Sequence, residues 1–179
     1  MIFYKFMNEW LYGEDGYYRK FREIGKEGDF FTAVSMTPFF GGAIGNKIYK
    51  ETKDKKDISI VEIGAHKGYM IVDIIRWIYT IDRDFLKRVK FFIIEKSKEV
   101  ANIQREFFKE KLKGEVEVEI LSSLSELKSN YAFFVSNEIF DAFGANLYYK
   151  EKIAYVKNWQ IVWEDASKED IEFAKRYNF

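Results

Sequence analysis

The sequence contains no cysteine, one proline and one histidine among its 179 residues. The absence of cysteine excludes a disulfide framework, a thiolate metal site and a cysteine nucleophile. A metal site is also disfavoured because the single histidine, His66, has no second histidine or cysteine to join it. We therefore expect no bound metal and, since nothing in the sequence requires an oxidising compartment, a cytoplasmic location.

An excess of charge of either sign is missing too, because 29 lysines and arginines balance 29 aspartates and glutamates. Proteins that bind nucleic acid usually carry a basic surface, so we expect no nucleic-acid partner. The sequence also lacks an apolar run long enough to cross a membrane, and residues 1–6 lead directly into charged residues rather than into an apolar signal segment. We accordingly expect no membrane partner.

What the sequence does contain is a regular alternation of strand and helix patterns. Short apolar or alternating runs predict four strands, at residues 58–63, 91–94, 116–120 and 132–135. Apolar residues at helical spacing predict helices over residues 71–78 and 100–112. This alternation is typical of an α/β fold with a doubly wound, mainly parallel sheet. The third strand has one polar face and belongs at an edge, so the expected strand order is 3-2-1-4.

The two ends of the chain differ from this core. Residues 3–11 predict an amphipathic helix, which a glycine-rich stretch follows. Residues 147–163 predict an antiparallel hairpin that turns at Lys157-Asn158, and Ser167 opens a last helix. We expect a single domain over residues 1–179, divided into an N-terminal helical segment, a core, and a hairpin with a helix at residues 1–50, 57–145 and 146–179.

A glycine loop joins the first predicted strand to the helix after it. Gly64, Ala65 and Gly68 lie where the backbone turns tightly and where a helix N-terminus offers unpaired N–H groups to a ligand. Glu62 precedes the loop, and an enclosed carboxylate there can bind a cationic group such as an amino-acid ammonium. The alternative is that the glycines only let the helix pack on the strand, and the loop alone does not decide between the two.

Glu95 is the second candidate, at the tip of the second predicted strand. In nucleoside-binding α/β folds an acid at this position accepts hydrogen bonds from the ribose hydroxyls. The alternative is an ordinary strand-end charge beside Lys96. The glycine loop and this acid together favour a nucleoside ligand.

The third candidate is a polar group at the carboxyl end of the fourth predicted strand. Asn137, Glu138 and Asp141 follow that strand, where open α/β sheets have their active crevice. These side chains can hold and orient a basic substrate. The alternative for Asp141 is that it caps the turn that follows.

Longer motifs around these residues resemble the MidA family of methyltransferases, whose mitochondrial members are complex I assembly factors. The most specific motifs are Gly28-Asp29-Phe30 and the segment from Asn137 to Ala142. The resemblance runs nearly end to end, over Phe6-Met7, Tyr12 to Tyr18, Gly28 to Thr32, Phe40-Gly41, Val61 to Ala65 with Gly68, Ile94 to Ser97 with Gln104, and Ser136 to Ala142.

The resemblance implies a Rossmann-like class I methyltransferase that binds S-adenosylmethionine and methylates an arginine of a protein partner. It implies that Gly28 to Thr32 form a lid over the cofactor and that Ser122 borders the adenine. Glu138 and Asp141 would clamp the guanidinium of the acceptor and receive its proton. The implied cofactor-binding residues are Gly28, Asp29, Thr32, Glu62, Gly64, Ala65, Gly68, Glu95, Ser122 and Asn137.

The sequence departs from the family pattern in three places. His66-Lys67 replaces the usual Gly-Arg, Ala33-Val34 replaces Ser-Pro, and the later strands of the family have no counterpart. Two alternatives to a protein arginine methyltransferase therefore stay open: a truncated, non-catalytic cofactor-binding or assembly-factor protein, and a small-molecule methyltransferase. Only the 147–163 hairpin is available to cover the outer side of the fourth strand, so we expect self-association or a partner chain that completes the sheet.

Overall fold

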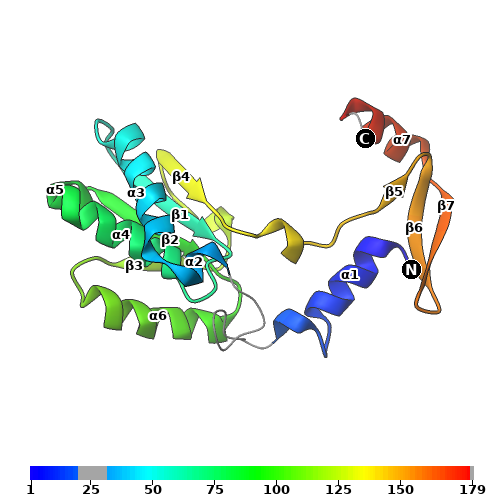
Figure 1. The fold of residues 1–179 in the computed structure, drawn as a ribbon, viewed down its shortest axis with the longest axis horizontal. Helices are drawn as coiled ribbons and strands as arrows, with labels where there is room; N and C mark the ends of the chain where they lie inside the picture. The colour runs from blue at the N-terminus through cyan, green and yellow to red at the C-terminus, as the bar shows by residue number, and fades with distance from the viewer. Residues whose placement is uncertain (20–31, 178–179) are drawn as a thin grey trace. The chain divides into compact units, whose positions relative to one another are not determined.

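The structure, a computed structural model, describes residues 1–19 and 32–177, which form two compact units (Figure 1). The larger unit contains the described residues between 21 and 139. The smaller unit contains those of residues 1–20 and 140–179. Within the described ranges, no helix is long and apolar enough to span a membrane.

The larger unit is built on a parallel four-stranded sheet in the order β3-β2-β1-β4, which confirms the order predicted from the sequence. The central position of β1 follows from its composition, since five of its six residues are buried. Strand β3 alternates apolar and glutamate residues and lies at an edge. The strands are β1 (Ile58–Ile63), β2 (Val89–Ile94), β3 (Val118–Leu121) and β4 (Tyr131–Val135).

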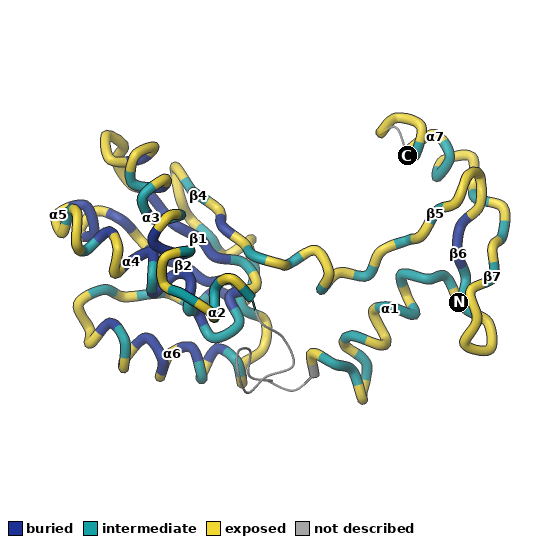
Figure 2. Tube along the Cα trace, viewed as in Figure 1, coloured by how far each residue is buried: buried dark blue, intermediate teal, exposed yellow. Residues whose placement is uncertain are grey.

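Helices pack against one face of this sheet and form the main core with it (Figure 2). The predicted helices are α4 and α6, whose apolar stripes bury Ile74, Ile78 and Phe107 against strand residues such as Ile60 and Ile93. The helical elements of the larger unit are α2 (Ala33–Met36), α3 (Pro38–Thr52), α4 (Tyr69–Ile81), α5 (Arg83–Leu86), α6 (Lys98–Leu112) and η2 (Leu124–Glu126).

Helix α3 belongs to this core, although the sequence groups residues 38–50 with an N-terminal segment. Its buried face contains Gly41, Gly42 and Gly45. A Cβ atom on Gly41 would lie 2.6 Å from the Cβ of Asp73 on α4, so glycine is what allows the two helices to approach. The same glycines lower the helix propensity of the segment, which explains why its sequence does not read as a helix.

The other face of the sheet carries a much smaller apolar cluster. Val61, Phe92 and Leu121 form its buried part, and Leu127 from the segment after β3 packs against them. Phe134 on β4 is 50% exposed, and in the described residues β4 pairs only with β1. The hairpin does not continue this sheet, because its strands form a separate sheet.

The smaller unit contains a three-stranded antiparallel sheet in the order β5-β6-β7. The predicted hairpin is present as β6–β7, but its turn is at Asn158-Trp159, one residue later than expected, with both residues left-handed at φ 50° and 63°. The predicted first strand is two strands, β5 and β6, because the chain turns back at Lys150-Glu151. The bounds are β5 (Tyr148–Tyr149), β6 (Lys152–Lys157) and β7 (Gln160–Asp165).

Helices at both ends of the chain complete this unit. In α1, the Phe6 and Trp10 rings lie edge-on to Trp159, and Ile2 bridges to Tyr155 of β6. Ser167 caps α7 by accepting the Asp170 N–H at 3.1 Å, as its sequence predicts. The helical elements are α1 (Phe3–Tyr12), η1 (Tyr17–Arg19), η3 (Phe140–Ala142) and α7 (Lys168–Arg176).

Candidate functional site

The strand register of the larger unit brings four of the predicted site residues to one edge of the sheet. Ile63 of β1 pairs with Ile94 of β2, and Ile94 pairs with Leu121 of β3. Glu62 pairs with Val135 of β4. Because parallel strands end at the same edge, the residues that follow them lie together there. These residues are Gly64, Glu95, Ser122 and Asn137.

The glycine loop after β1 is a tight turn in which the Gly68 N–H donates to the Ala65 carbonyl at 2.7 Å. Gly64, His66 and Gly68 all have left-handed backbones, with φ of 72°, 49° and 94°. Gly64 is exposed to solvent, and the atoms nearest to a Cβ atom there would belong to the Ile139 side chain, the first of them at 3.1 Å. The loop therefore offers open backbone at Gly64.

Gly68 has a different environment from Gly64. A Cβ atom on Gly68 would lie 2.5 Å from the ring of Phe108 on α6. Glycine is needed here for packing between the loop and α6, so the packing interpretation holds for Gly68. A contact of Gly68 with a ligand stays a prediction.

Glu62 is 3% exposed and accepts the Ile71 N–H at 3.0 Å. It therefore satisfies one of the donors at the N-terminus of α4, which the helix itself leaves unpaired. Burial raises the pKa of the Glu62 carboxyl to about 8, the hydrogen bond from Ile71 lowers it, and the charge of Asp73 raises it. The structure thus gives Glu62 a position beneath the loop, where it orients α4.

Glu95 follows the last residue of β2, the position predicted from the sequence, and it is partly buried. Its carboxylate accepts the Ser97 N–H at 2.7 Å, and its own N–H donates to the Leu121 carbonyl at 2.9 Å. Burial raises the pKa of the carboxyl, while the backbone N–H groups of Ser97 and Lys96 lower it. The side chain is held in place beside the start of α6 and the end of β3.

Ser122 is held by Glu126, a residue that is not among the predicted site residues. The Ser122 N–H donates to the Glu126 carboxylate at 3.2 Å, and the Ser122 hydroxyl also donates to it. This pair closes the loop between β3 and η2. A serine and a glutamate four residues apart after a strand are the signal that could have predicted the loop.

The N-terminal part of the predicted site is described only at Thr32. Gly28 and Asp29 lie outside the described residues. The Thr32 hydroxyl accepts the Ser35 N–H at 3.3 Å and caps α2. The structure therefore assigns Thr32 a local role, and the predicted lid over the cofactor stays a prediction.

The two predicted catalytic carboxylates belong to different units. Glu138 follows Asn137 in the larger unit, is exposed and has a left-handed backbone with φ 50°. Asp141 lies in η3 of the smaller unit and is also exposed. Together with burial, which is the larger cause, the charge of Asp141 raises the pKa of Tyr18 in the same unit.

Gln104 is a polar residue that belongs to the family-like motifs but is not among the predicted site residues. It lies on the apolar stripe of α6, is 0% exposed, and donates from Nε2 to the His66 carbonyl at 2.7 Å. A glutamine among the buried residues of an amphipathic helix is the signal that could have identified it.

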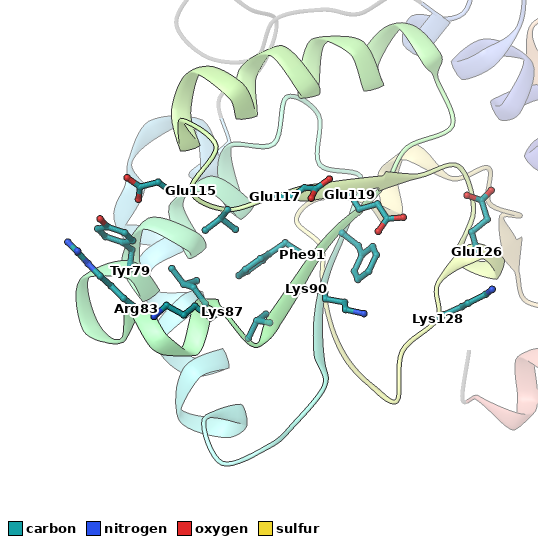
Figure 3. A pocket seen from close by; sticks show the side chains of 14 residues that line it. Tyr79, Arg83, Lys87, Lys90, Phe91, Glu115, Glu117, Glu119, Glu126 and Lys128 are labelled. Atoms are coloured by element: carbon teal, nitrogen blue, oxygen red, sulfur yellow. The ribbon is translucent and has the colours of Figure 1, made fainter.

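A hollow of about 770 Å³ lies away from this edge, near the amino end of β2 (Figure 3). Its lining includes Glu115, Glu117 and Glu119 from the β3 edge, together with Lys90 and Lys128. Charged side chains along a free strand edge oppose pairing with another strand, which accounts for the glutamates in this lining. Among the side chains that the structure describes, no group of three histidines, aspartates or glutamates could hold a metal ion.

Comparisons of the sequence with known proteins give consistent results. The model of a family described as "Putative S-adenosyl-L-methionine-dependent methyltransferase" matches residues 43–178. The mitochondrial protein arginine methyltransferase NDUFAF7 of Bos taurus is 24% identical over 157 residues, which cover 75% of this chain and 35% of that protein. The Homo sapiens protein of the same name is 24% identical over 172 residues, covering 84% and 38%.

A solved structure from Burkholderia thailandensis, a suspected methyl transferase bound to S-adenosyl-homocysteine, has the same fold. It matches with a TM-score of 0.77 and 21% identity, over 98% of this chain and 48% of that one. The chain thus spans less than half the length of these relatives.

Proposed function

The chain belongs to the family of S-adenosyl-L-methionine-dependent methyltransferases whose model matches residues 43–178, and we propose that it binds this cofactor at the carboxyl edge of its parallel sheet. Membership confirms the resemblance that the motifs indicate. The observation that carries the proposal is the meeting of Gly64 and Glu95 at paired strand ends, since the residues before them, Ile63 and Ile94, are partners in the sheet.

The residues at this edge fit the parts of the cofactor. Gly64 is open and has no side chain, so the methionine part can approach the Gly64–Ala65 backbone closely. Glu95 places a carboxylate at the end of β2, where the ribose hydroxyls would donate to it. Ser122, at the end of β3, would border the adenine.

The remaining predicted residues would surround this arrangement. Asn137 would contribute from the end of β4, and Glu62 and Gly68 would support the loop from beneath and from the side of α6. Thr32 would approach with Gly28 and Asp29 as the lid. These assignments rest on the family pattern together with the strand ends described above.

When bound, the cofactor supplies a methyl group whose transfer from sulfonium is already favourable. The side chains would then mainly orient the acceptor and exclude water. Glu138 and Asp141 are exposed carboxylates, the type of group that binds a guanidinium through paired hydrogen bonds. We propose that they hold an arginine of a protein substrate and receive the proton that its nitrogen loses; the name of the relatives at 24% identity supports this acceptor.

A second candidate function is cofactor binding without methyl transfer, as in an assembly factor. The replacement of the family's usual Gly-Arg by His66-Lys67 in the glycine loop favours it. A small-molecule acceptor is the remaining alternative.

The test is calorimetric titration of the purified chain with S-adenosylmethionine and S-adenosylhomocysteine. Replacing Glu95 with alanine should raise Kd about tenfold or more, because buried ribose hydroxyls would lose their acceptor. Glu119→Ala, an exposed glutamate on β3, is the matched control and should leave Kd unchanged. Failure of the unchanged chain to bind either compound would overturn the proposal.

Methylation assays then separate the candidate functions. Transfer of labelled methyl to a protein arginine supports the first, and transfer only to small acceptors supports the small-molecule alternative. Cofactor binding with no transfer supports the non-catalytic candidate. We also propose a cytoplasmic location, which cell fractionation tests; the curated relatives are mitochondrial by name.

A further inference from the structure

Gln104 is one of few polar side chains in the core of the larger unit. It is 0% exposed on α6, between the buried residues Ala101 and Phe107. A primary amide in such a place is unfavourable unless its polar atoms are paired. Among the residues that the structure describes, its buried Oε1 atom has no hydrogen-bond partner, so the amide remains in the core although only part of its hydrogen-bonding capacity is used there. An apolar side chain of similar length would fill the same space without that cost.

The amide has one specific bond, and it goes to the glycine loop. Nε2 of Gln104 donates to the His66 carbonyl at 2.7 Å. The amide must present its N–H side here, because a carbonyl oxygen can only accept. His66 has a left-handed backbone with φ 49°, a conformation that non-glycine residues seldom adopt and that needs support from its surroundings.

The same helix also fixes the next part of the loop. Phe108, one turn after Gln104 on α6, fills the place where Gly68 would carry a Cβ atom. Residues 66 and 68 are thus held by one face of α6, the first through a hydrogen bond and the second through a close contact. In a trans peptide the carbonyl and the following N–H point in opposite directions. The bond to Gln104 therefore fixes which way the His66–Lys67 peptide faces.

We infer that Gln104 is a positioning residue of the cofactor site: it holds the His66 carbonyl and so keeps the Gly64–Ala65 backbone in the path that receives the ligand. The inference rests on the proposed cofactor site. Gln104 acts through the loop and does not touch the ligand, because its side chain is wholly buried.

The experiment compares two substitutions at this position. Gln104→Met keeps the length of the side chain and removes the donor. Gln104→Glu keeps its shape and can donate to the His66 carbonyl only when the carboxyl is protonated. Gln160→Met, at the exposed start of β7 in the other unit, is the matched control. Each protein is titrated with S-adenosylhomocysteine by calorimetry at pH 5.5 and pH 8, and its unfolding is followed separately.

Gln104→Met should raise Kd about tenfold at both pH values relative to the unchanged chain. Gln104→Glu should bind more weakly at pH 8 than at pH 5.5, where the protonated carboxyl restores the donor to the His66 carbonyl. His66, Glu62 and Glu95 can also titrate near the site, so every Kd is compared with that of the unchanged chain at the same pH. If Gln104 contributed only to packing, its substitution would change the unfolding midpoint. The affinity of the folded molecules for S-adenosylhomocysteine, and the pH dependence of that affinity, would stay unaltered.

The possible results separate this inference from the proposed function. Binding by the unchanged chain with unaltered Kd in both variants overturns the positioning role and leaves the cofactor site standing. Absence of binding by the unchanged chain overturns both. If Gln104→Met does not fold, the pH-dependent recovery of Gln104→Glu decides: recovery supports the role, and equal affinity at both pH values relative to the unchanged chain rejects it.

Discussion

At the scale of single residues, Glu62 is a buried carboxyl whose pKa differs between the folded and the unfolded chain. Its carboxyl has an ordinary pKa of 4.5, and burial raises the pKa in the folded protein to about 8. Between these values the folded chain binds more protons than the unfolded chain. The contribution of Glu62 to stability is therefore greatest below pH 4.5 and is lost as the pH rises through about 8.

We expect the free energy of unfolding to fall between pH 5 and pH 8, by at most about 4 kcal/mol from this residue. Glu62→Gln keeps an oxygen that can accept the Ile71 N–H but does not titrate, so it should flatten the dependence. Urea unfolding at pH 5 and pH 8 measures this pH dependence of the free energy of unfolding, with Glu119→Gln as the control. Asp73 and Glu95 also have raised pKa values, so they too make the free energy of unfolding fall as the pH rises. The contribution of Glu62 is therefore the difference between the variants in the slope of this free energy against pH. Equal slopes for Glu62→Gln and the unchanged chain would contradict this assignment.

The residues of the candidate site differ in whether the neighbouring sequence is enough to predict their positions. Gly64 and Glu95 could be predicted because a strand end is visible in sequence and parallel strands end at one edge. Gln104 and Glu126 act through contacts with the loop and with Ser122, which depend on how helices and turns pack. Nothing in the residues beside Gln104 in sequence says which backbone carbonyl it meets.

At the scale of elements, the close contact between α6 and the turn before α4 requires a glycine at position 68, and the cost of replacing it can be measured. Gly68→Ala would place a methyl group 2.5 Å from the Phe108 ring in a backbone with φ 94°. Gly114 also has a left-handed backbone, with φ 77°, but a Cβ atom there would have no described atom within 4 Å apart from its chain neighbours. We expect Gly114→Ala to cost about 1 kcal/mol of stability and Gly68→Ala about 3 kcal/mol or more.

Thermal and urea unfolding of the two alanine variants measure this difference. The Gly114 variant isolates the cost of the backbone conformation, and the excess in the Gly68 variant is the cost of moving α6 away from the loop. Similar losses in both variants would mean that the ring of Phe108 moves aside easily.

The elements themselves could be predicted where the apolar period is clean. Strands β1, β2 and β4 and helices α4 and α6 have continuous or periodic apolar residues, and the structure contains all of them. Helix α3 could not, because the glycines that let it approach α4 remove the apolar residues that would have marked its buried face. The division of residues 147–156 into two strands depends on a turn at Lys150, where φ is 56°. The turn could not be predicted, because this left-handed position holds a lysine instead of a glycine.

At the scale of the whole molecule, the two edges of the parallel sheet differ in protection. The β3 edge carries Glu117 and Glu119, whereas β4 has no charged residue and leaves Phe134 50% exposed. An uncharged apolar edge is prone to pair with another strand. We therefore expect the isolated chain to self-associate as its concentration rises.

Light scattering over a concentration series tests this expectation. Phe134→Lys should shift association to higher concentration, because it puts a charge on the edge strand. Phe39→Lys, which changes a 77% exposed phenylalanine on α3, is the control and should have little effect. A chain that stays monomeric at high concentration would show that the β4 edge is harmless as it stands.

Helix α6 touches both halves of the candidate site, since Ser97 at its start donates to Glu95 and Gln104 in its middle holds the loop. A ligand that tightens either half must therefore damp the opening motions of this helix. Deuterium uptake by the backbone amides of residues 98–112 should slow when the site fills, although none of those residues is proposed to touch the ligand. The helix would serve as a built-in reporter of occupancy, readable by mass spectrometry without any label on the protein.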